Sequence, residues 1–403
     1  MSSAKSINLI KTAPFWGLFY FGENTISEAV HRLGGGKGEA DMVTISLCMI
    51  VKNEEAVLER CLESIQDVVD EIVIVDTGST DKTKEIAARY TDKIYDFPWC
   101  DDFSAARNFV FSKGTGEYLL WMDADDVFPT VEKRKIFDLK EELKKEPKDI
   151  VMMLYDAAFD ERGKPTFSYY RERLIRNCPQ AKWQGFVHEV IAPFGEIKYA
   201  DIHFEHRKEK GAYSDRNLKI YEKMLSEGKR LEPREQFYYG RDCFYHGKYE
   251  TAAEVLDGFL KEKEGWLENK LEAVRILSYS LYAIEEREKA FDALLQGLRL
   301  APPTGEHCCD MGRYFFEKEE WETAVFWYEN ALKAERRTEK GAFVQEECYG
   351  YLPCIQLCVC YDRLGELERA KMYNEMAGVL QPNAEAVQKN REYFMGKGKG
   401  SSM

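Results

Sequence analysis

The chain has 403 residues, which is long for one ordinary domain and sufficient for two. Hydrophobic residues make up 44% of it and charged residues 32%, a balance typical of a soluble globular protein. The formal net charge of -14 argues against general binding to nucleic acid or to an anionic membrane, because phosphate groups would be repelled. An anionic ligand would therefore need a local binding device, such as a metal ion.

The N-terminal segment lacks the charged start, apolar core and small-residue cleavage site of a secretory signal. Its apolar run, residues 14–21, is far shorter than the roughly 20 residues of a membrane span. Eleven cysteines without an export signal favour reduced thiols. We therefore expect a cytoplasmic protein with no membrane span. The cysteines at 354, 358 and 360 do not have the spacing of a zinc site and lie in a helical pattern, which favours a structural role.

From Met42 onward, apolar strands alternate with amphipathic helices. We expect strands at 43–51, 71–77, near Ile94 and at 117–125, and helices at 54–68, 82–90 and 104–112. This alternation predicts a parallel sheet covered on both faces, with ligands bound at the carboxyl ends of its strands.

Beyond about Gly211, helices replace the strands and a pattern repeats. A small residue is followed twelve positions later by alanine in four places: Gly240 and Ala252, Ser278 and Ala290, Gly312 and Ala324, Cys358 and Ala370. The alanines lie 38, 34 and 46 residues apart, and Pro302 and Pro382 mark expected helix ends. This is the tetratricopeptide pattern, in which small residues let paired helices pack closely. We expect an extension with a glycine-rich linker at 1–41, an α/β domain at 42–217, repeats at 218–395 and a flexible tail at 396–403.

Four polar motifs follow the predicted strands or open the helices after them. They are VKNE at 51–54, DTGSTD at 76–81, DDFSAARN at 101–108 and DADD at 123–126. The last is the strongest, because carboxylates at the end of a buried strand concentrate negative charge and require a compensating cation. Hard oxygen ligands suit Mg²⁺ or Mn²⁺, which could bridge the phosphates of a nucleoside diphosphate.

The other motifs also have structural interpretations. Asn53 could cap the helix after the first strand, and Ser79, Thr80 or Asp81 could each cap the next helix. Asp76 ends a buried strand, where a carboxylate can accept a hydrogen bond from a nucleobase. Arg107 falls in the first turn of a helix that Ser104 could cap, where it could bind phosphate. The alternative is an arginine on a solvated helix face.

In this order, the motifs VKNEE, IVDTGSTDKT, DFSAARN and MDADD resemble the family 2 glycosyltransferases with a GT-A fold. The resemblance covers roughly Met42 to Asn217, and the repeats resemble the subset with a tetratricopeptide tail, among which bacterial peptide S-glycosyltransferases look nearest. The resemblance implies an α/β GT-A domain, with a Rossmann-like, mostly parallel sheet, followed by an all-α tetratricopeptide solenoid. The motifs are specific for fold and reaction class, and they do not identify the acceptor.

The resemblance also implies a set of site residues. Asp76 would read the nucleobase; Asp123 and Asp125 would handle ribose, phosphate and metal, with Asp125 the more direct ligand. His206 would complete the metal shell, although a lone histidine is more often structural, as His203 is expected to be. The implied nucleotide-sugar site comprises Val51, Asn53, Glu54, Asp76, Ser79, Arg107, Asp123, Ala124 and Arg173.

Two later segments also fit the family. RERLIR at 171–176 looks like a strand whose arginines could face the diphosphate or the acceptor, and WQGFVHE at 183–189 resembles the family's acceptor motif. An inverting mechanism needs a base for the acceptor proton, and Glu189 is the first candidate and His188 the second.

The leading hypothesis is a metal-dependent inverting glycosyltransferase that moves a sugar from a UDP-sugar to a polypeptide Cys or Ser side chain. The repeats would bind the extended acceptor; alternatively they are structural or join two copies of the chain, and the acceptor is a cell-surface glycan or lipid-linked sugar. An inactive, peptide-binding scaffold is disfavoured because the carboxylates are present, and a nucleotidyltransferase because no early glycine-rich loop occurs. If the repeats only bind acceptor, removing residues after Leu231 should spare donor hydrolysis.

Overall fold

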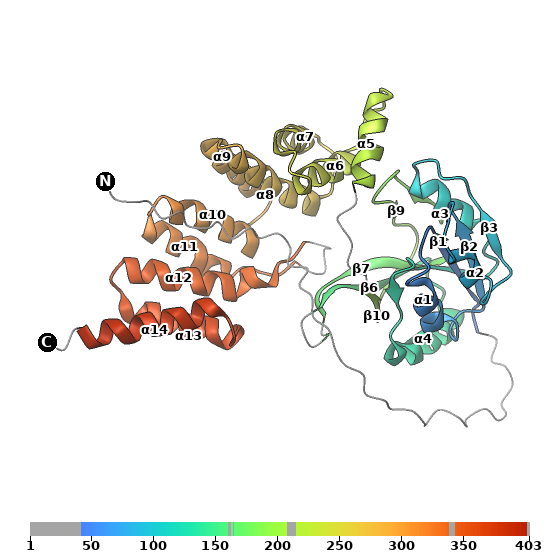
Figure 1. Ribbon diagram of the computed structural model, residues 1–403, viewed down its shortest axis with the longest axis horizontal. Helices are drawn as coiled ribbons and strands as arrows, with labels where there is room; N and C mark the ends of the chain where they lie inside the picture. Colours follow the sequence, from blue (N-terminus) through green and yellow to red (C-terminus); the bar gives the residue numbers. More distant parts are fainter. Residues whose placement is uncertain (1–41, 160–162, 164, 208–214, 338–342, 401–403) are drawn as a thin grey trace.

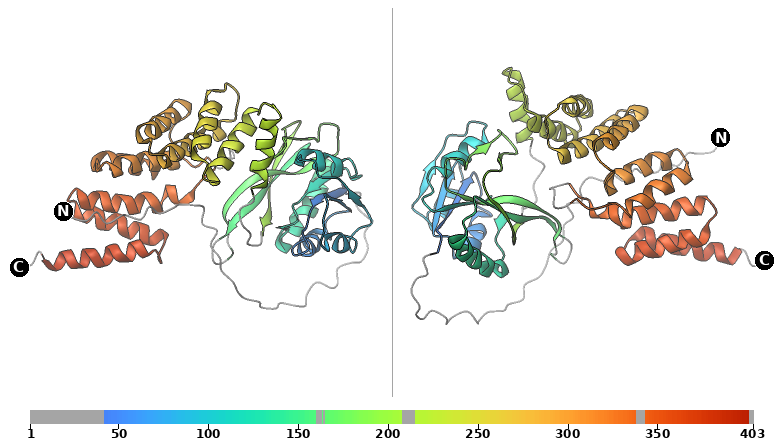
Figure 2. Two further views of the ribbon diagram at one scale, coloured as in Figure 1. Left: turned by 45° about the horizontal axis from the view of Figure 1, so that its top comes forward. Right: turned by 180° about the vertical axis from the view of Figure 1, so that it is seen from behind.

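The computed structural model describes residues 42–159, 163, 165–207, 215–337 and 343–400. These residues form a sheet-containing part and a stack of helices that lie side by side (Figures 1 and 2). The expected α/β domain followed by a helical solenoid is confirmed. The expected extension at 1–41 lies outside the described residues.

The first part alternates strands and helices through β4 and then becomes mostly strands. Its elements are β1 (Ile45–Val51), α1 (Leu58–Ile65), β2 (Glu71–Asp76), α2 (Thr83–Ala87), β3 (Ile94–Asp96), α3 (Phe103–Phe111), β4 (Tyr118–Trp121), β5 (Asp126–Val127), the 3-10 turn η1 (Thr130–Glu132), α4 (Lys133–Lys145), β6 (Ile150–Phe159), β7 (Pro165–Arg176), β8 (Trp183–Gln184), β9 (Val190–Ile191) and β10 (Ile197–His206). The helices α1 and α2 are shorter than expected.

Eight strands form one sheet in the order β3-β2-β1-β4-β7-β6-β10-β5, and β8 pairs with β9 separately. β1, β2, β3 and β4 are parallel, β7 runs antiparallel to both its neighbours, and β10 runs parallel to β6. The residues of β1 alternate between two hydrophobic cores. Leu47 packs into a core with residues of α1, α2 and α4, whereas Cys48 packs into a core with residues of α3 and β8. Helices therefore cover both faces of the parallel half, as its continuous apolar strands predict.

The second part consists of α5 (Arg216–Ser226), α6 (Pro233–Tyr245), α7 (Tyr249–Lys261), α8 (Leu267–Ala283), α9 (Arg287–Leu300), α10 (Gly305–Glu317), α11 (Trp321–Ala331), the 3-10 turn η3 (Glu346–Tyr349), α12 (Tyr351–Arg363), α13 (Leu367–Leu380) and α14 (Glu385–Gly400). The four predicted small-residue and alanine pairs fall on the helix pairs α6–α7, α8–α9, α10–α11 and α12–α13. α14 continues through Gly400, so the expected flexible tail from 396 begins inside a helix.

Close packing explains the small residues. A β-carbon built on Gly240 of α6 would lie 2.6 Å from Leu256 Cγ of α7, and one on Gly312 of α10 would lie 2.8 Å from the ring of Tyr328 of α11. The partner alanines at 252, 324 and 370 are fully buried. The small residues thus stand where the two helices of a pair pack too closely for a larger side chain, as the repeat pattern predicts.

The 46-residue spacing reflects an insertion between α11 and α12 that contacts the first helices of earlier repeats. Arg337 forms an ion pair with Glu268 of α8 at 2.9 Å, and Glu306 of α10 accepts a hydrogen bond from the Gln345 backbone at 2.7 Å. Phe343 packs against Phe237 of α6, with ring centroids 6.0 Å apart. The chain's own insertion therefore covers part of the surface formed by α6, α8 and α10 in the repeats that were expected to bind the acceptor.

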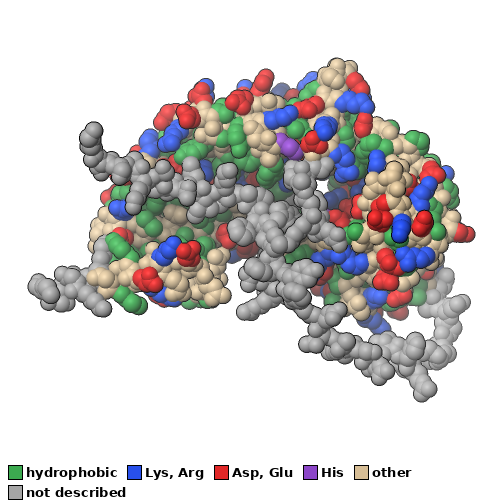
Figure 3. Space-filling model, in the orientation of Figure 1, with side chains coloured by type: hydrophobic (Ala, Val, Ile, Leu, Met, Phe, Trp, Pro, Cys, Tyr) green, Lys and Arg blue, Asp and Glu red, His purple; other side chains and the backbone are tan. Residues whose placement is uncertain are grey.

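None of the described helices is long and apolar enough to cross a bilayer. On the face shown in Figure 3, acidic and basic side chains of the described residues are interspersed over both parts. All eleven cysteines are free thiols, ten of them at least partly buried.

Candidate active site

The site lies where β1, β2 and β4 end side by side. Val51 at the end of β1 is in register with Asp76 at the end of β2, and β4 pairs with the other side of β1. Parallel strands bring their carboxyl ends to one edge, so three motifs far apart in sequence meet there.

The loops after β1 and β2 are interlocked by hydrogen bonds. The amide oxygen of Asn53 accepts a hydrogen bond from Thr80 N at 2.8 Å, and the Asn53 backbone N–H donates to Ser79 Oγ at 2.9 Å. Asn53 has a positive φ of 55°, which asparagine tolerates better than most residues. α1 instead begins after Val57, so the helix-cap interpretations of Asn53 and Ser79 are wrong: both side chains join the two loops.

Asp76 is buried and only half satisfied. Its Oδ2 accepts hydrogen bonds from the backbone N–H groups of Gly78 and Ser79, at 3.0 and 2.9 Å. Its Oδ1 is buried with no hydrogen-bond partner among the described residues. A buried, unpartnered acceptor is costly, and a ligand donor such as a base N–H would satisfy it.

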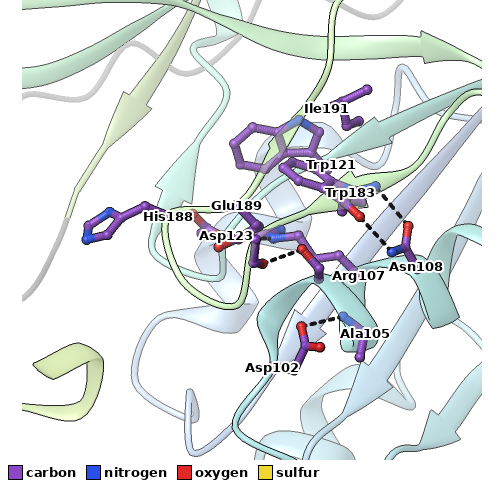
Figure 4. Close-up of polar contacts among 12 residues, drawn as sticks. Asp102, Ala105, Arg107, Asn108, Trp121, Asp123, Trp183, His188, Glu189 and Ile191 are labelled. Carbon is purple, nitrogen blue, oxygen red and sulfur yellow. Dashed lines mark hydrogen bonds and ion pairs between the residues drawn. The ribbon is translucent and has the colours of Figure 1, made fainter. Parts of the chain in front are cut away.

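Arg107 organises the centre of the site (Figure 4). Its Nη2 donates to Asp123 Oδ1 at 2.7 Å and its Nε donates to Glu189 Oε1 at 2.5 Å. The guanidinium carbon lies 4.9 Å from the ring centroids of both Trp121 and Trp183. Since its side chain is 7% exposed, the alternative of an arginine on a solvated helix face is wrong. Arg107 therefore links Asp123 of the DADD motif to Glu189 of the WQGFVHE segment.

The helix that carries Arg107 is capped by a different residue from the one expected. Asp102, not Ser104, accepts the N-cap hydrogen bond, from Ala105 N at 2.9 Å. Ser104 Oγ donates instead to the carbonyl of Gly185 at 2.5 Å. Ser104 thus connects α3 to residues 185–189 between β8 and β9, which we call the acceptor-side loop.

Charge pairing sets the ionisation of the site. Burial by itself would raise the pKa of Asp123, but the charge and hydrogen bond of Arg107 outweigh it and lower the pKa to about 2. Burial, followed by the charges of Asp125 and Asp123, raises the pKa of Glu54 to about 7. The edge of the sheet therefore carries more carboxylates than it can hold charged without a further cation.

A group able to hold a metal ion forms where β5 pairs with β10. Pairing of Asp126 with His206 brings one donor atom each of Asp125, Asp126 and His206 within 4.8 Å of one another. Burial alone would lower the pKa of His206, but Asp125 and Asp126 raise it to about 10. Carboxylate oxygens with one imidazole fit Mn²⁺ or Mg²⁺. Among the described residues this is the one such group, and the cysteines near 358 do not form another.

Two residues that were expected to bind metal or diphosphate do not belong to this group. Asp123, expected to share the metal, is bonded to Arg107 and lies outside the group. Arg173, expected to face the diphosphate, is 0% exposed and pairs with Asp126 Oδ2 at 3.0 Å, with its guanidinium stacked 3.9 Å from the ring centroid of Trp121. Arg173 is therefore a buried counter-ion that fixes Asp126, and it does not reach the open site.

Val51 and Ala124, both expected in the nucleotide-sugar site, do not present their side chains to it. The carbonyl of Val51 accepts hydrogen bonds from Thr77 N and Thr77 Oγ1, and both the Val51 and Ala124 side chains are in the core. His203 lies between Asp156 and Asp201, at 3.0 and 3.2 Å. Its contacts are with structural carboxylates, in line with the expected role.

His188 turns away from Glu189 (Figure 4). Its ring stacks on Tyr238 of α6, with centroids 4.1 Å apart and planes 15° apart, and its Nε2 lies 3.5 Å from Asp242 Oδ2. The imidazole is therefore directed at the repeats, which argues against it as the base. Glu189, in contrast, faces Arg107, and its Oε2 has no hydrogen bond within the described part of the chain.

The segment RERLIR forms the end of β7, and its Arg171 lies 4.8 Å from the centroid of Trp121 with a partly exposed side chain. Sequence reasoning missed two other residues of the site. Arg216, at the start of α5, is close enough to Glu54, Asp123 and Glu189 to interact with their charges. Tyr155 donates to Asp126 Oδ1 at 2.8 Å. Asp126, the last aspartate of the DADD motif, was part of the predicted acidic cluster but was not assigned to the metal from sequence.

The sheet order and the acidic edge after β4 define a GT-A-type α/β domain, here joined to a tetratricopeptide array. Residues 46–194 match the model of glycosyl transferase family 2. The chain thus carries a family 2 glycosyltransferase domain.

The chain is also similar to a protein described by its repeats and to a named glycosyltransferase. A protein of Synechococcus elongatus described as TPR repeat-containing is 37% identical over 153 residues, 38% of this chain and 36% of that protein. The SPbeta prophage-derived glycosyltransferase SunS of Bacillus subtilis is 30% identical over 249 residues, 57% of this chain and 56% of SunS. The matched stretches span about half or less of the length of these relatives.

Among solved structures, TarS of S. aureus in complex with UDP is 15% identical, covers 64% of this chain and 88% of its own, and has a TM-score of 0.33. That structural similarity is weak.

Proposed function

We propose that the protein is a metal-dependent inverting glycosyltransferase that uses a UDP-sugar. The observation that carries the proposal is the meeting, at one sheet edge, of the acidic DADD motif, His206 and the Arg107–Glu189 pair. The family 2 match supports the reaction class. The unsatisfied Oδ1 of Asp76 supports a nucleobase at the end of β2.

In the reaction we propose, Asp125 and His206 would hold the cation while Asp126, fixed by Arg173 and Tyr155, orients His206. A divalent metal bound there would supply Lewis-acid stabilisation of charge on the diphosphate leaving group. Arg171, partly exposed beside Trp121, would contact the same phosphates.

The transfer itself needs a nucleophile, a base and a leaving group. The acceptor heteroatom forms a bond to the anomeric carbon while the bond from that carbon to the diphosphate oxygen breaks. Glu189 Oε2 receives the acceptor proton, and the bond electrons leave with the nucleoside diphosphate. Arg107 holds the other oxygen of Glu189 and so fixes the direction of the base.

For the acceptor we propose a polypeptide Cys or Ser side chain. The resemblance to peptide S-glycosyltransferases and the tetratricopeptide array support this choice. Because the insertion before α12 covers the face of α8 and α10, we place peptide binding nearer the junction of the repeats with the acceptor-side loop. A glycan or lipid-linked acceptor is the alternative.

A donor screen tests the reaction class. Purified protein with Mn²⁺ or Mg²⁺ and a panel of UDP- and GDP-sugars should release nucleoside diphosphate from one UDP-sugar, and chelation should stop the release. Asp125→Ala should abolish it without loss of folding, whereas Asp201→Ala, which removes an exposed carboxylate beside His203, should not. Full activity of Asp125→Ala would refute the metal assignment.

A further inference from the structure

One face of the first repeat helix is occupied by a single residue of the acceptor-side loop. Arg234, Tyr238 and Asp242 lie four residues apart on α6 and so project from one side of it. All three contact His188. Arg234 Nη2 donates to the His188 carbonyl at 3.1 Å, Tyr238 stacks on its ring, and Asp242 lies 3.5 Å from its Nε2.

The backbone at His188 needs such support. Its φ of 52° lies in the left-handed region, which is unfavourable for a residue with a β-carbon. Asp242 is 2% exposed, and its Oδ2 lies 3.5 Å from His188 Nε2, an approach that is an ion pair only when the imidazole is protonated; neither atom has a hydrogen-bond partner among the described residues. The neighbouring Val187 belongs to a core shared with Tyr221 and Tyr239 of the helical part.

The next residue is Glu189, whose carboxylate contacts Arg107. Because a turn with positive φ sets the direction of the chain that follows it, the conformation of His188 determines where Glu189 points. α3 holds the other end of the same loop, since Phe103 N donates to the Phe186 carbonyl at 3.0 Å.

We propose that Arg234, Tyr238 and Asp242 are positioning residues that act through His188 to hold Glu189 against Arg107. The first repeat is thus part of the catalytic apparatus rather than only an acceptor-binding attachment. This inference rests on the proposed function for its catalytic meaning, while the holding of the loop stands on the contacts themselves.

The test uses the full chain and four variants. Tyr238→Ala removes the stacked ring, Tyr238→Phe keeps it, and Asp242→Asn removes the charge that faces His188. Phe259→Leu is the control, because Phe259 packs on Phe237 inside the repeats and does not contact the loop. Two quantities are measured: hydrogen exchange of the backbone amides at 185–191, and kcat and KM for donor hydrolysis.

We expect Tyr238→Ala and Asp242→Asn to speed exchange at 185–191 about tenfold and to lower kcat about 10- to 100-fold, with KM for the donor within about twofold. Tyr238→Phe should behave like the wild type. Phe259→Leu should lower Tm but leave loop exchange and kcat unchanged.

If loop exchange and kcat change no more in Tyr238→Ala than in Phe259→Leu, the proposal is overturned, and the role of α6 is limited to packing the two parts together. If the wild type hydrolyses no donor, the proposed function fails, and loop exchange alone still decides whether α6 holds the loop.

Discussion

Replacing Arg107 with methionine tests how strongly the centre of the site depends on one cation. Methionine keeps an unbranched apolar chain between Trp121 and Trp183 but leaves two carboxylates unpaired. The Glu189 side chain is 11% exposed and that of Asp123 is 39% exposed, so most of the cost falls on Glu189. Removing one partner of a buried pair costs about 3–5 kcal/mol, and we expect the lower end because solvent screens Asp123.

The pH dependence of this loss has a definite sign. Arg107 lowers the pKa of Asp123 to about 2 from 3.8, so this contribution is complete above pH 3.8 and is lost as the pH falls through 2. The stability difference between wild type and Arg107→Met should therefore shrink between pH 4 and 2.

Urea unfolding monitored by tryptophan fluorescence measures both effects. The double variant Arg107→Met with Glu189→Gln should be more stable than Arg107→Met alone by at least about 1 kcal/mol, because it removes the unpaired charge. A loss below about 0.5 kcal/mol at pH 7, or a difference that grows on acidification, would show that the carboxylates do not depend on Arg107.

Three further predictions concern stability. Burial alone would raise the pKa of Glu71, but hydrogen bonds lower it from 4.5 to about 2. Glu71→Gln should therefore cost up to about 3 kcal/mol of stability at pH 7, a contribution that is complete above pH 4.5 and is lost as the pH falls through 2. Urea unfolding at pH 7 and pH 3 checks this, and a loss of stability that does not depend on pH would contradict it. Gly240→Ala should lower stability by about 1–3 kcal/mol through the clash with Leu256, whereas Gly258→Ala, with open space around its β-carbon, should not; equal Tm values for the two would refute the contact. Ending the chain at Leu231 should impair donor hydrolysis and lower the Tm of the remaining domain, because the helices removed share a core with the acceptor-side loop. The sequence had instead predicted that donor hydrolysis would be spared. A truncated protein with wild-type turnover and Tm would support the prediction from sequence.

The sequence was sufficient for the features that depend on local patterns. Strands β1, β2 and β4 are buried on both faces and therefore read as continuous apolar runs, and the polar motifs after them had to meet at one edge of a parallel sheet. The repeat pattern likewise predicted contacts such as that of Gly240 with Leu256, because helices that pack this closely require a small residue at the point of contact. The fold class and the DADD edge follow from these patterns.

The sequence could not decide which of several polar residues a side chain would meet. Asn53, Ser79 and Ser104 are all good helix caps by composition, yet each bonds another segment of the chain, because tertiary partners compete with local ones. Arg173 matches a ligand-binding arginine in type and position, and only its full burial against Asp126 shows it to be a counter-ion.

Contacts across long sequence distances were decided by the tertiary structure alone. The antiparallel pairing of β5 with β10 brings His206 to Asp125, and packing of α6 on the acceptor-side loop turns His188 away from the site. No periodicity or spacing encodes such pairs, since they arise only when separate elements bury their surfaces against one another. Sequence thus determined which elements form and where the motifs lie, and packing determined which charges meet there.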